Sequence, residues 1–158
     1  MNGTAPTLRS AHRTAYALGL ALCLGTPGLI GVLLRSGLVP PGTQAPEGIF
    51  QQIGYFFTGL VFLTAAWVWG RSGRVLRSFS LLPETRRPAV ILREGLLYAG
   101  ALETSSLCGL VYWILVGEHA ARHVWGFILL TPLFYLALMP RYDRWAKAAG
   151  AGQARREN

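Results

Sequence analysis

Four long apolar runs constrain this chain more than any other feature. They cover about residues 15–34, 49–70, 90–117 and 124–139, of which the last is the shortest. A helix needs about 20 apolar residues to cross the hydrocarbon core of a bilayer, where every backbone polar group must find a partner within the protein. The runs lack the short alternation of membrane β-strands. We therefore expect an all-α fold, an integral membrane four-helix bundle.

The charges are few, and they are confined to the intervals between these runs. Only 14% of the residues are charged, whereas soluble domains carry about 25%. This pattern excludes an ordinary soluble domain, a disordered chain and a disulfide scaffold. The net charge of +8 does not indicate nucleic acid as a partner, because a nucleic-acid binder displays its charge on a polar surface. We expect residues 1–158 to form one transmembrane domain whose partner is the lipid bilayer.

The basic residues predict how the bundle is oriented. Most of the 15 Lys and Arg residues fall in the N-terminus, in the loop 71–88 and in the C-terminal tail, and the opposite side holds Arg35 and Arg122. Cytoplasmic loops carry the excess of Lys and Arg. We therefore expect both termini in the cytoplasm, in a bacterial-type inner (plasma) membrane. The segments 36–48 and 118–123 then face outside.

The first apolar run has two interpretations. Its basic start resembles that of a secretory signal peptide, but the run is about 20 residues long, against 7–15 for a usual signal-peptide core. No small-x-small cleavage site closes it. The orientation rule favours a retained helix, with a cleaved leader as the alternative.

Glu103 is the residue that most calls for an explanation. It lies ten residues past Arg93, which places it about 15 Å into the membrane at 1.5 Å per residue. A carboxyl there is expensive to ionise, so it should be protonated, paired, or facing water or the bundle interior. It is either a functional proton- or cation-binding group or a protonated carboxyl hydrogen-bonded across helices for structure.

Hydroxyl groups in the other spans fall at a similar depth. We expect a polar layer near Glu103 that consists of Ser106, Thr58, Thr131 and Thr26. The alternative is that each Thr hydroxyl bonds its own i−4 carbonyl, as is common in membrane helices. Two spans contain a proline within a Thr-Pro pair, at Pro27 and Pro132, which predicts a kink or a static bend.

The cysteines and histidines give weaker indications of a chemical role than Glu103 does. The two cysteines, Cys23 and Cys108, form no C-x-x-C motif and are expected to be small core residues at different heights. His119 and His123 form an H-x-x-x-H pair beside Glu118, which is a candidate start of a metal site but supplies only two imidazoles. No phosphate-cradling loop or nucleophile triad is visible, and we expect no cofactor.

Two further patterns concern packing and the membrane interface. Gly25, Gly28 and Gly31 form a smooth stripe that suits helix packing. Aromatic residues near the ends of the spans fit an interfacial belt; they include Trp67, Trp69, Trp125, Tyr142 and Trp145. The tail 141–149 is either an amphipathic segment on the inner leaflet or a solvated anchor.

The third run resembles part of a known family. Residues 87–116 begin with an Arg-Pro turn and carry a carboxyl near mid-membrane. The residues that carry the resemblance are Ala101, Leu102, Glu103, Gly109, Leu110 and Val111. This segment resembles the second helix of the proteolipid c subunit of rotary ATP synthases, whose Glu carries the ion. The resemblance implies a proton- or cation-binding role for Glu103. It is confined to this helix, because residues 49–70 carry bulky aromatics where that family has a glycine stripe.

Three functions fit these patterns. The first is a non-enzymatic accessory or assembly subunit of a homo- or hetero-oligomeric membrane complex, in which Glu103 pairs with a polar group of a partner. The second is a transport or coupling protein in which Glu103 binds a proton or cation. The third, an enzyme acting on a lipid or quinone, requires several convergent polar groups in a pocket, and Glu103 alone stands out. The sequence slightly favours the accessory subunit.

Overall fold

The structure, a computed structural model, describes residues 7–42 and 47–154, and most of these are helical. The α-helices there are α1 (Leu8–Arg35), α2 (Glu47–Ser78), α3 (Arg87–Leu102), α4 (Thr104–Val116), α5 (Ala121–Leu138) and α6 (Tyr142–Ala154). Three short 3₁₀ turns join them: η1 (Phe79–Leu81), η2 (Glu84–Arg86) and η3 (Glu118–Ala120). Four helical stretches are long and apolar enough to cross a membrane: Leu8–Arg35, Gly48–Phe79, Glu84–Val116 and Glu118–Gly150. The prediction of an all-α chain with four candidate membrane helices is confirmed.

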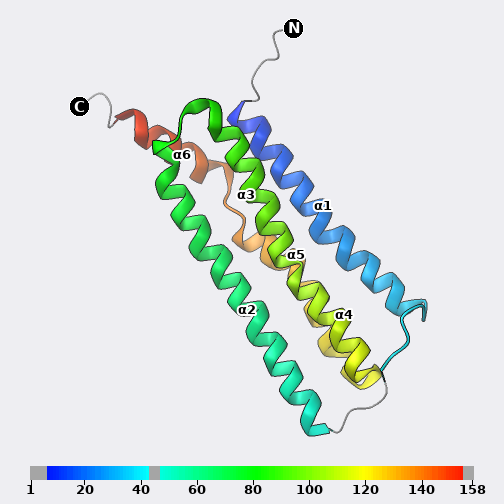
Figure 1. Cartoon of the computed structure of the whole chain (residues 1–158). Helices are drawn as coiled ribbons and strands as arrows, with labels where there is room; N and C mark the ends of the chain where they lie inside the picture. The colour runs from blue at the N-terminus through cyan, green and yellow to red at the C-terminus, as the bar shows by residue number, and fades with distance from the viewer. Residues whose placement is uncertain (1–6, 43–46, 155–158) are drawn as a thin grey trace.

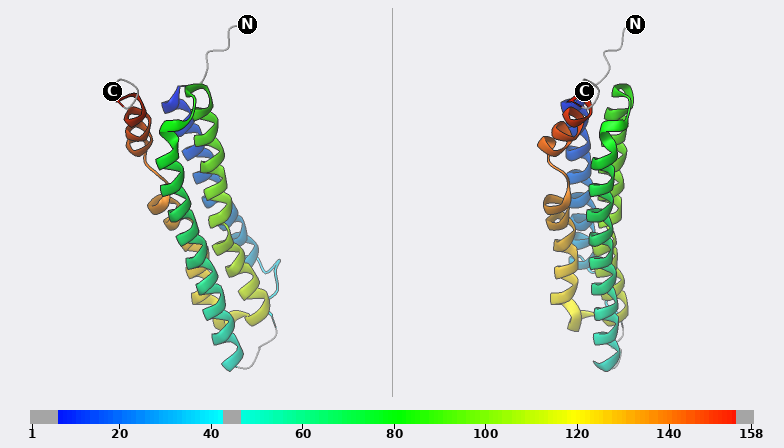
Figure 2. Two further views of the ribbon diagram at one scale, coloured as in Figure 1. Left: turned by 60° about the vertical axis from the view of Figure 1, so that its left-hand side comes forward. Right: turned by 90° about the vertical axis from the view of Figure 1, so that its left-hand side faces the viewer.

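The helices form an elongated bundle around a central column (Figure 1). α3 and α4 lie end to end in this column, which packs against α1, α2 and α5. The start of α1, the turns η1 and η2, and α6 lie at one end, here called the α6 end. The end of α1, the start of α2 and η3 lie at the opposite, η3 end, as Figure 2 shows from two further sides.

The helices extend beyond the apolar runs at the α6 end. α1 begins at Leu8 rather than near residue 15, because the Thr7 hydroxyl accepts the Ser10 N–H at 3.3 Å and caps the first turn. α2 continues to Ser78, past the predicted end near residue 70. Helical backbone thus carries the charged residues that border the spans. The predicted third helix, 90–117, is interrupted at Glu103 and divides into α3 and α4.

A buried ion pair joins α2 to α3 near the α6 end. Arg71 donates from Nε and Nη2 to the two carboxylate oxygens of Glu94, each at 2.7 Å. The Glu94 side chain is 5% exposed and that of Arg71 is 28% exposed. Bidentate geometry of this kind satisfies both charges where water is scarce. Arg71, which counts among the basic residues of the loop 71–88 in the orientation prediction, is thus paired with a carboxylate.

α6 closes the same end of the bundle. Trp145 of α6 is fully buried, with its ring centroid 4.8 Å from that of Phe79. The Arg87 guanidinium also lies over the Phe79 ring, 6.0 Å from its centroid, and donates to the Leu82 carbonyl at 3.1 Å. Trp145 was predicted to belong to an interfacial aromatic belt. It lies inside the protein, because the connection between α2 and α3 offers it an apolar surface.

The glycines that permit close helix approach are not the predicted stripe. A side chain at Gly25 or Gly28 would meet open space. A Cβ at Gly95 would lie 3.0 Å from Cβ of Ala15, and one at Gly19 would overlap the Tyr135 phenol. Gly31 alone of the stripe is covered, by the Trp125 ring at 3.1 Å from the position of a Cβ. The close contacts of α1 with α3 and α5 therefore depend on Gly95 and Gly19.

We expect the Arg71–Glu94 pair to stabilise the bundle only as a pair. Arg71→Met alone should lower the free energy of unfolding by about 2 kcal/mol, because it leaves the buried Glu94 charge without a partner. Glu94→Met alone should cost less, because the Arg71 side chain is 28% exposed. The double variant should lose much less than the sum of the two, since an apolar pair replaces an ionic one. Thermal unfolding in a mild detergent measures all three.

Glu84→Gln is the matched control for this prediction. The Glu84 side chain is 74% exposed, so its loss should change stability by no more than about 0.5 kcal/mol. A loss in the double variant equal to the sum of the two single losses would show that Arg71 and Glu94 do not stabilise the bundle as a pair.

Candidate functional site

The interruption of the central column at Glu103 is the candidate functional site. Glu103 has φ −59° and ψ −18°, which is close to helical. Its N–H donates to the Ala99 carbonyl at 3.2 Å, and its own carbonyl accepts from the Leu107 N–H at 3.0 Å. The column therefore continues through Glu103, although the regular helix is interrupted there.

A hydroxyl from α5 occupies the place of one hydrogen bond of the helical ladder. In a regular helix the Ser106 N–H would donate to the Leu102 carbonyl. Here the Ser106 N–H donates to Oγ1 of Thr131 at 3.1 Å, and the Thr131 hydroxyl donates to the Leu102 carbonyl at 3.4 Å. Thr131 is thus inserted into the ladder, which is a known cause of helix interruption.

Two serines complete this contact between α4 and α5. Oγ of Ser106 lies 2.6 Å from Oγ1 of Thr131, so the two hydroxyls share a hydrogen bond. Ser105 donates to the Phe127 carbonyl at 2.6 Å. Ser105, Ser106 and Thr131 are all buried. The hydroxyl groups of the site are therefore fully used in joining the two helices.

The Glu103 carboxyl lies beside this cluster without joining it. Both of its oxygens are inaccessible, and neither has a hydrogen-bond partner among the described residues. α1 is close by, since Sγ of Cys23 lies 3.8 Å from the same Ala99 carbonyl that accepts the Glu103 N–H. Pro27 has no N–H, so it leaves the Cys23 carbonyl without its i+4 donor. The carboxyl thus lies in the interior of the bundle, close to polar atoms but unpaired.

The predicted polar layer forms only in part. Ser106 and Thr131 come together as expected, about one helical turn away from Glu103. Thr58 does not join them, because its hydroxyl donates to its own i−4 carbonyl, that of Gly54, at 2.8 Å. Thr26 is half-buried on α1 and takes no part in the Ser106–Thr131 pair. The interpretation of a threonine bonded to its own helix therefore holds for Thr58 and not for Thr131.

Thr58 instead lines a second pocket toward the η3 end, together with the two candidate metal-ligating histidines. This pocket has a volume of about 360 Å³, and its walls include His119, His123 and Tyr112. The Tyr112 hydroxyl donates to the Phe50 carbonyl at 2.9 Å. Among residues 7–42 and 47–154, no three His, Cys, Asp or Glu side chains are grouped closely enough to hold a metal. The two imidazoles thus have no third protein ligand there.

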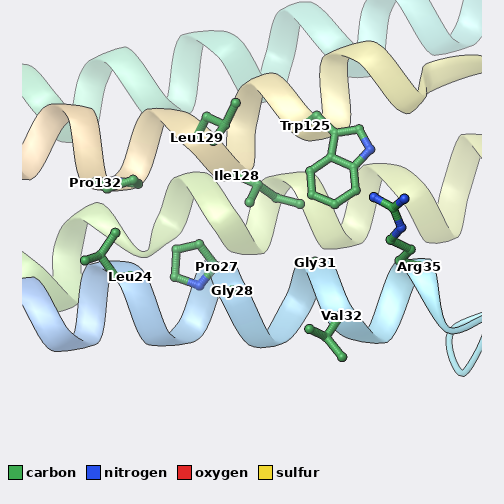
Figure 3. A pocket seen from close by; sticks show the side chains of 10 residues that line it. All are labelled: Leu24, Pro27, Gly28, Gly31, Val32, Arg35, Trp125, Ile128, Leu129 and Pro132. Carbon is green, nitrogen blue, oxygen red and sulfur yellow. The ribbon is translucent and has the colours of Figure 1, made fainter.

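The two prolines within the spans face a common apolar groove (Figure 3). Pro27 of α1 and Pro132 of α5 lie on its opposite walls, and Trp125 covers Gly31 near one end. Both helices continue through their proline. The volume of the groove is about 370 Å³. Its lining is almost entirely apolar, so it lacks the polar groups that chemistry would require.

Both cysteines are free and buried, as predicted. Cys23 lies at the level of Ala99, and Cys108 lies nine residues farther along the column, about 13 Å at 1.5 Å per residue.

Neither the Arg71–Glu94 pair nor the insertion of Thr131 was predicted. The first could have been suspected from an acidic residue within the basic border, whereas the second depends on how α4 and α5 pack.

Comparison with family models, with curated proteins and with solved structures finds no match for this chain. The features that indicate a function lie around Glu103: a buried carboxyl, an interrupted helix, and a hydroxyl pair one turn away.

We expect Thr131→Val to lower the free energy of unfolding by about 1 kcal/mol, a typical value for a hydrogen bond between membrane helices. The change removes the contact of α5 with Ser106 and Leu102. Thr131→Ser keeps the hydroxyl and should retain most of the stability. Thermal unfolding in detergent is the measurement.

Thr58→Val provides the control, since the Thr58 hydroxyl is exposed and bonds only its own helix. It should change stability by less than about 0.5 kcal/mol. If Thr131→Val is no more harmful than Thr58→Val, the inserted hydroxyl does not hold α4 to α5.

Proposed function

We propose that this protein is a non-enzymatic membrane protein that binds a proton at Glu103, as part of transport or coupling. The observation that carries the proposal is the buried carboxyl whose two oxygens have no partner among the described residues. An ionised carboxylate in such a place is strongly disfavoured, and a proton is the simplest ligand that neutralises it. The resemblance of this helix to that of proteolipid c subunits points the same way.

A proton fits this place better than a metal cation. A hard cation requires several oxygen ligands, and the nearest hydroxyls, of Ser106 and Thr131, are already engaged with each other and with the backbone. Glu103 alone would have to supply the charge. We therefore infer that the group which exchanges at Glu103 is a proton.

The arrangement suggests how protonation would act on the bundle. Ser106 is three residues past Glu103, a spacing at which side chains meet on a helix. Loss of the proton would create a carboxylate that competes with Thr131 for the Ser106 hydroxyl. Proton release would thus weaken the hydroxyl pair that joins α4 to α5. Protonation is in this way coupled to helix packing.

The structure supports an accessory subunit, in which Glu103 pairs with a partner chain, less well than the sequence does. A partner would have to reach the carboxyl oxygens, and these are enclosed by the chain itself. A membrane enzyme would require several convergent polar groups, whereas the hydroxyls at this site are occupied. Proton binding needs neither a partner chain nor free polar groups.

The proposed location is a bacterial-type inner (plasma) membrane with the α6 end in the cytoplasm. Basic residues at the α6 end include Arg9, Arg13, Arg74, Arg77, Arg141, Arg144 and Lys147, whereas Arg35 and Arg122 lie toward the η3 end. Arg155 and Arg156 lie outside the described residues. Since positive charge is retained on the cytoplasmic side, this distribution favours the N-in, C-in orientation.

This orientation predicts the behaviour of reporter fusions. A green fluorescent protein fused to the C-terminus should fluoresce, and alkaline phosphatase fused there should be inactive. Alkaline phosphatase fused after Val39, beyond the end of α1, should be active. The opposite pattern would reverse the proposed orientation.

Labelling with a hydrophobic carbodiimide tests the proton site. The reagent reacts with protonated carboxyls in apolar surroundings, so we expect Glu103 to be labelled in native membranes and Glu103→Gln to lose that label. The label should fall as the pH is raised, because an ionised carboxyl does not react. Mass spectrometry of the modified peptide identifies the residue.

Glu118→Gln provides the control, since Glu118 lies in the η3 turn outside the central column and should not contribute to the label. Proton flux in proteoliposomes gives an independent measurement, and Glu103→Gln should abolish it. Labelling that does not depend on pH, or flux that is unchanged in Glu103→Gln, would refute a proton-exchanging Glu103.

A further inference from the structure

A large basic cleft lies at the α6 end, away from Glu103. It is formed by the first turns of α1 and by the connection from α5 to α6, and its volume is about 990 Å³. Its walls carry three arginines, Arg9, Arg13 and Arg141, together with the aromatic side chains of Tyr16 and Tyr142. Nothing in the proton-binding proposal uses this cleft.

The three arginines are available to bind an anion. All three are exposed, and none forms an ion pair with a carboxylate among the described residues. This separates them from Arg71, which is paired with Glu94, and from Arg87, which bonds the carbonyls that come after α2. Guanidinium groups gathered in one cleft are well suited to a phosphate, which accepts their paired N–H donors.

The floor of the cleft is held in place by a chain of contacts. Nε2 of His12 lies 3.1 Å from the Pro140 carbonyl, and the His12 ring contacts both Tyr142 and Tyr16, with centroids 5.8 and 6.1 Å apart. Tyr16 contacts Tyr135, whose hydroxyl donates to the α1 backbone. α1 and the α5–α6 connection are therefore fixed relative to each other, and the cleft exists before any ligand arrives.

The cleft becomes apolar as it leaves the α6 end. Beyond Arg13, its α1 wall continues through Ala17 and Leu20. The next residue on the same face, at i+4, is Leu24, which begins the apolar groove between α1 and α5 shown in Figure 3. That groove runs on to Val32. A basic cleft and an apolar groove thus lie one after the other along the seam between α1 and α5.

The distance from the basic cleft to Pro27 of the apolar groove matches one half of a bilayer. From Arg13 to Pro27 the α1 wall is about 21 Å long at 1.5 Å per residue, and half of a bilayer with its headgroup region is about 20 Å thick. The basic cleft lies at the border of the membrane spans, where a lipid headgroup lies. Charge, position and the change in polarity all indicate the same class of ligand.

We propose that this seam binds one anionic phospholipid, with its phosphate headgroup among Arg9, Arg13 and Arg141 and one acyl chain in the groove between Pro27 and Pro132. The phosphate is the group that the arginines recognise. The acyl groove distinguishes a lipid from free phosphate, because only a lipid fills both parts.

The test compares phosphatidylglycerol, phosphatidylcholine and inorganic phosphate as ligands of the full chain, purified in detergent. Native mass spectrometry gives the lipid retained, and the rise in melting temperature gives the apparent affinity. We expect phosphatidylglycerol to bind at least tenfold more tightly than phosphatidylcholine. The double variant Arg13→Gln with Arg141→Gln should weaken phosphatidylglycerol binding by about 30-fold. Each basic residue near a membrane surface contributes about fivefold to binding, and the two losses multiply.

Two matched controls separate the headgroup from the chain. Arg74→Gln with Arg86→Gln removes the same charge from exposed residues outside the cleft and should leave binding within about twofold of the unchanged protein. Gly28→Leu fills the groove where a side chain meets open space, and Gly25→Leu adds the same bulk outside the groove. Gly28→Leu should reduce lipid retention, and Gly25→Leu should not.

Several results would overturn the proposal. Equal binding of the two lipids, or equal loss in both arginine double variants, would mean that the cleft does not select a headgroup. Binding of inorganic phosphate without retention of phosphatidylglycerol would mean that the site takes a free anion. Unchanged lipid retention in Gly28→Leu would show that no acyl chain occupies the groove. Helical circular dichroism establishes that each variant is folded.

Discussion

A membrane helix must satisfy its backbone polar groups without water, and this constraint governs the centre of the molecule. The Leu102 carbonyl and the Ser106 N–H cannot be left open in hydrocarbon. The Thr131 hydroxyl bonds both and so permits a helix interruption that would otherwise be costly. The Ser106 hydroxyl and N–H and the Leu102 carbonyl are all bonded to this one inserted side chain, which joins α4 to α5.

Hydrophobicity is enough to predict the spans, but it does not predict where side chains from different helices meet. Four apolar runs indicate four candidate spans, because bilayer thickness fixes their length. Ser106 and Thr131 were placed at one depth by counting residues, but counting gives no rotation about the helix axis. It therefore grouped Thr58 with them, although Thr58 faces another pocket. The burial of Trp145 against Phe79 was missed for the same reason.

The basic residues at the α6 end serve different purposes that a net charge conceals. Arg71 neutralises a buried carboxylate, and Arg87 holds the connection between α2 and α3. Arg9, Arg13 and Arg141 have no carboxylate partner among the described residues and face a common cleft. Charge counting predicts orientation from all of them together, whereas only the structure separates the structural arginines from those that a ligand can reach.

The insertion of Thr131 also has a consequence for the order in which the protein is made. Leu102 and Ser106 are synthesised before Thr131, so the third span is complete before α5 has been made. Until α5 arrives, the Ser106 N–H has only the Leu102 carbonyl as its helical partner, and the third span is a regular helix. Its interruption at Glu103 therefore depends on the packing of α5 against it.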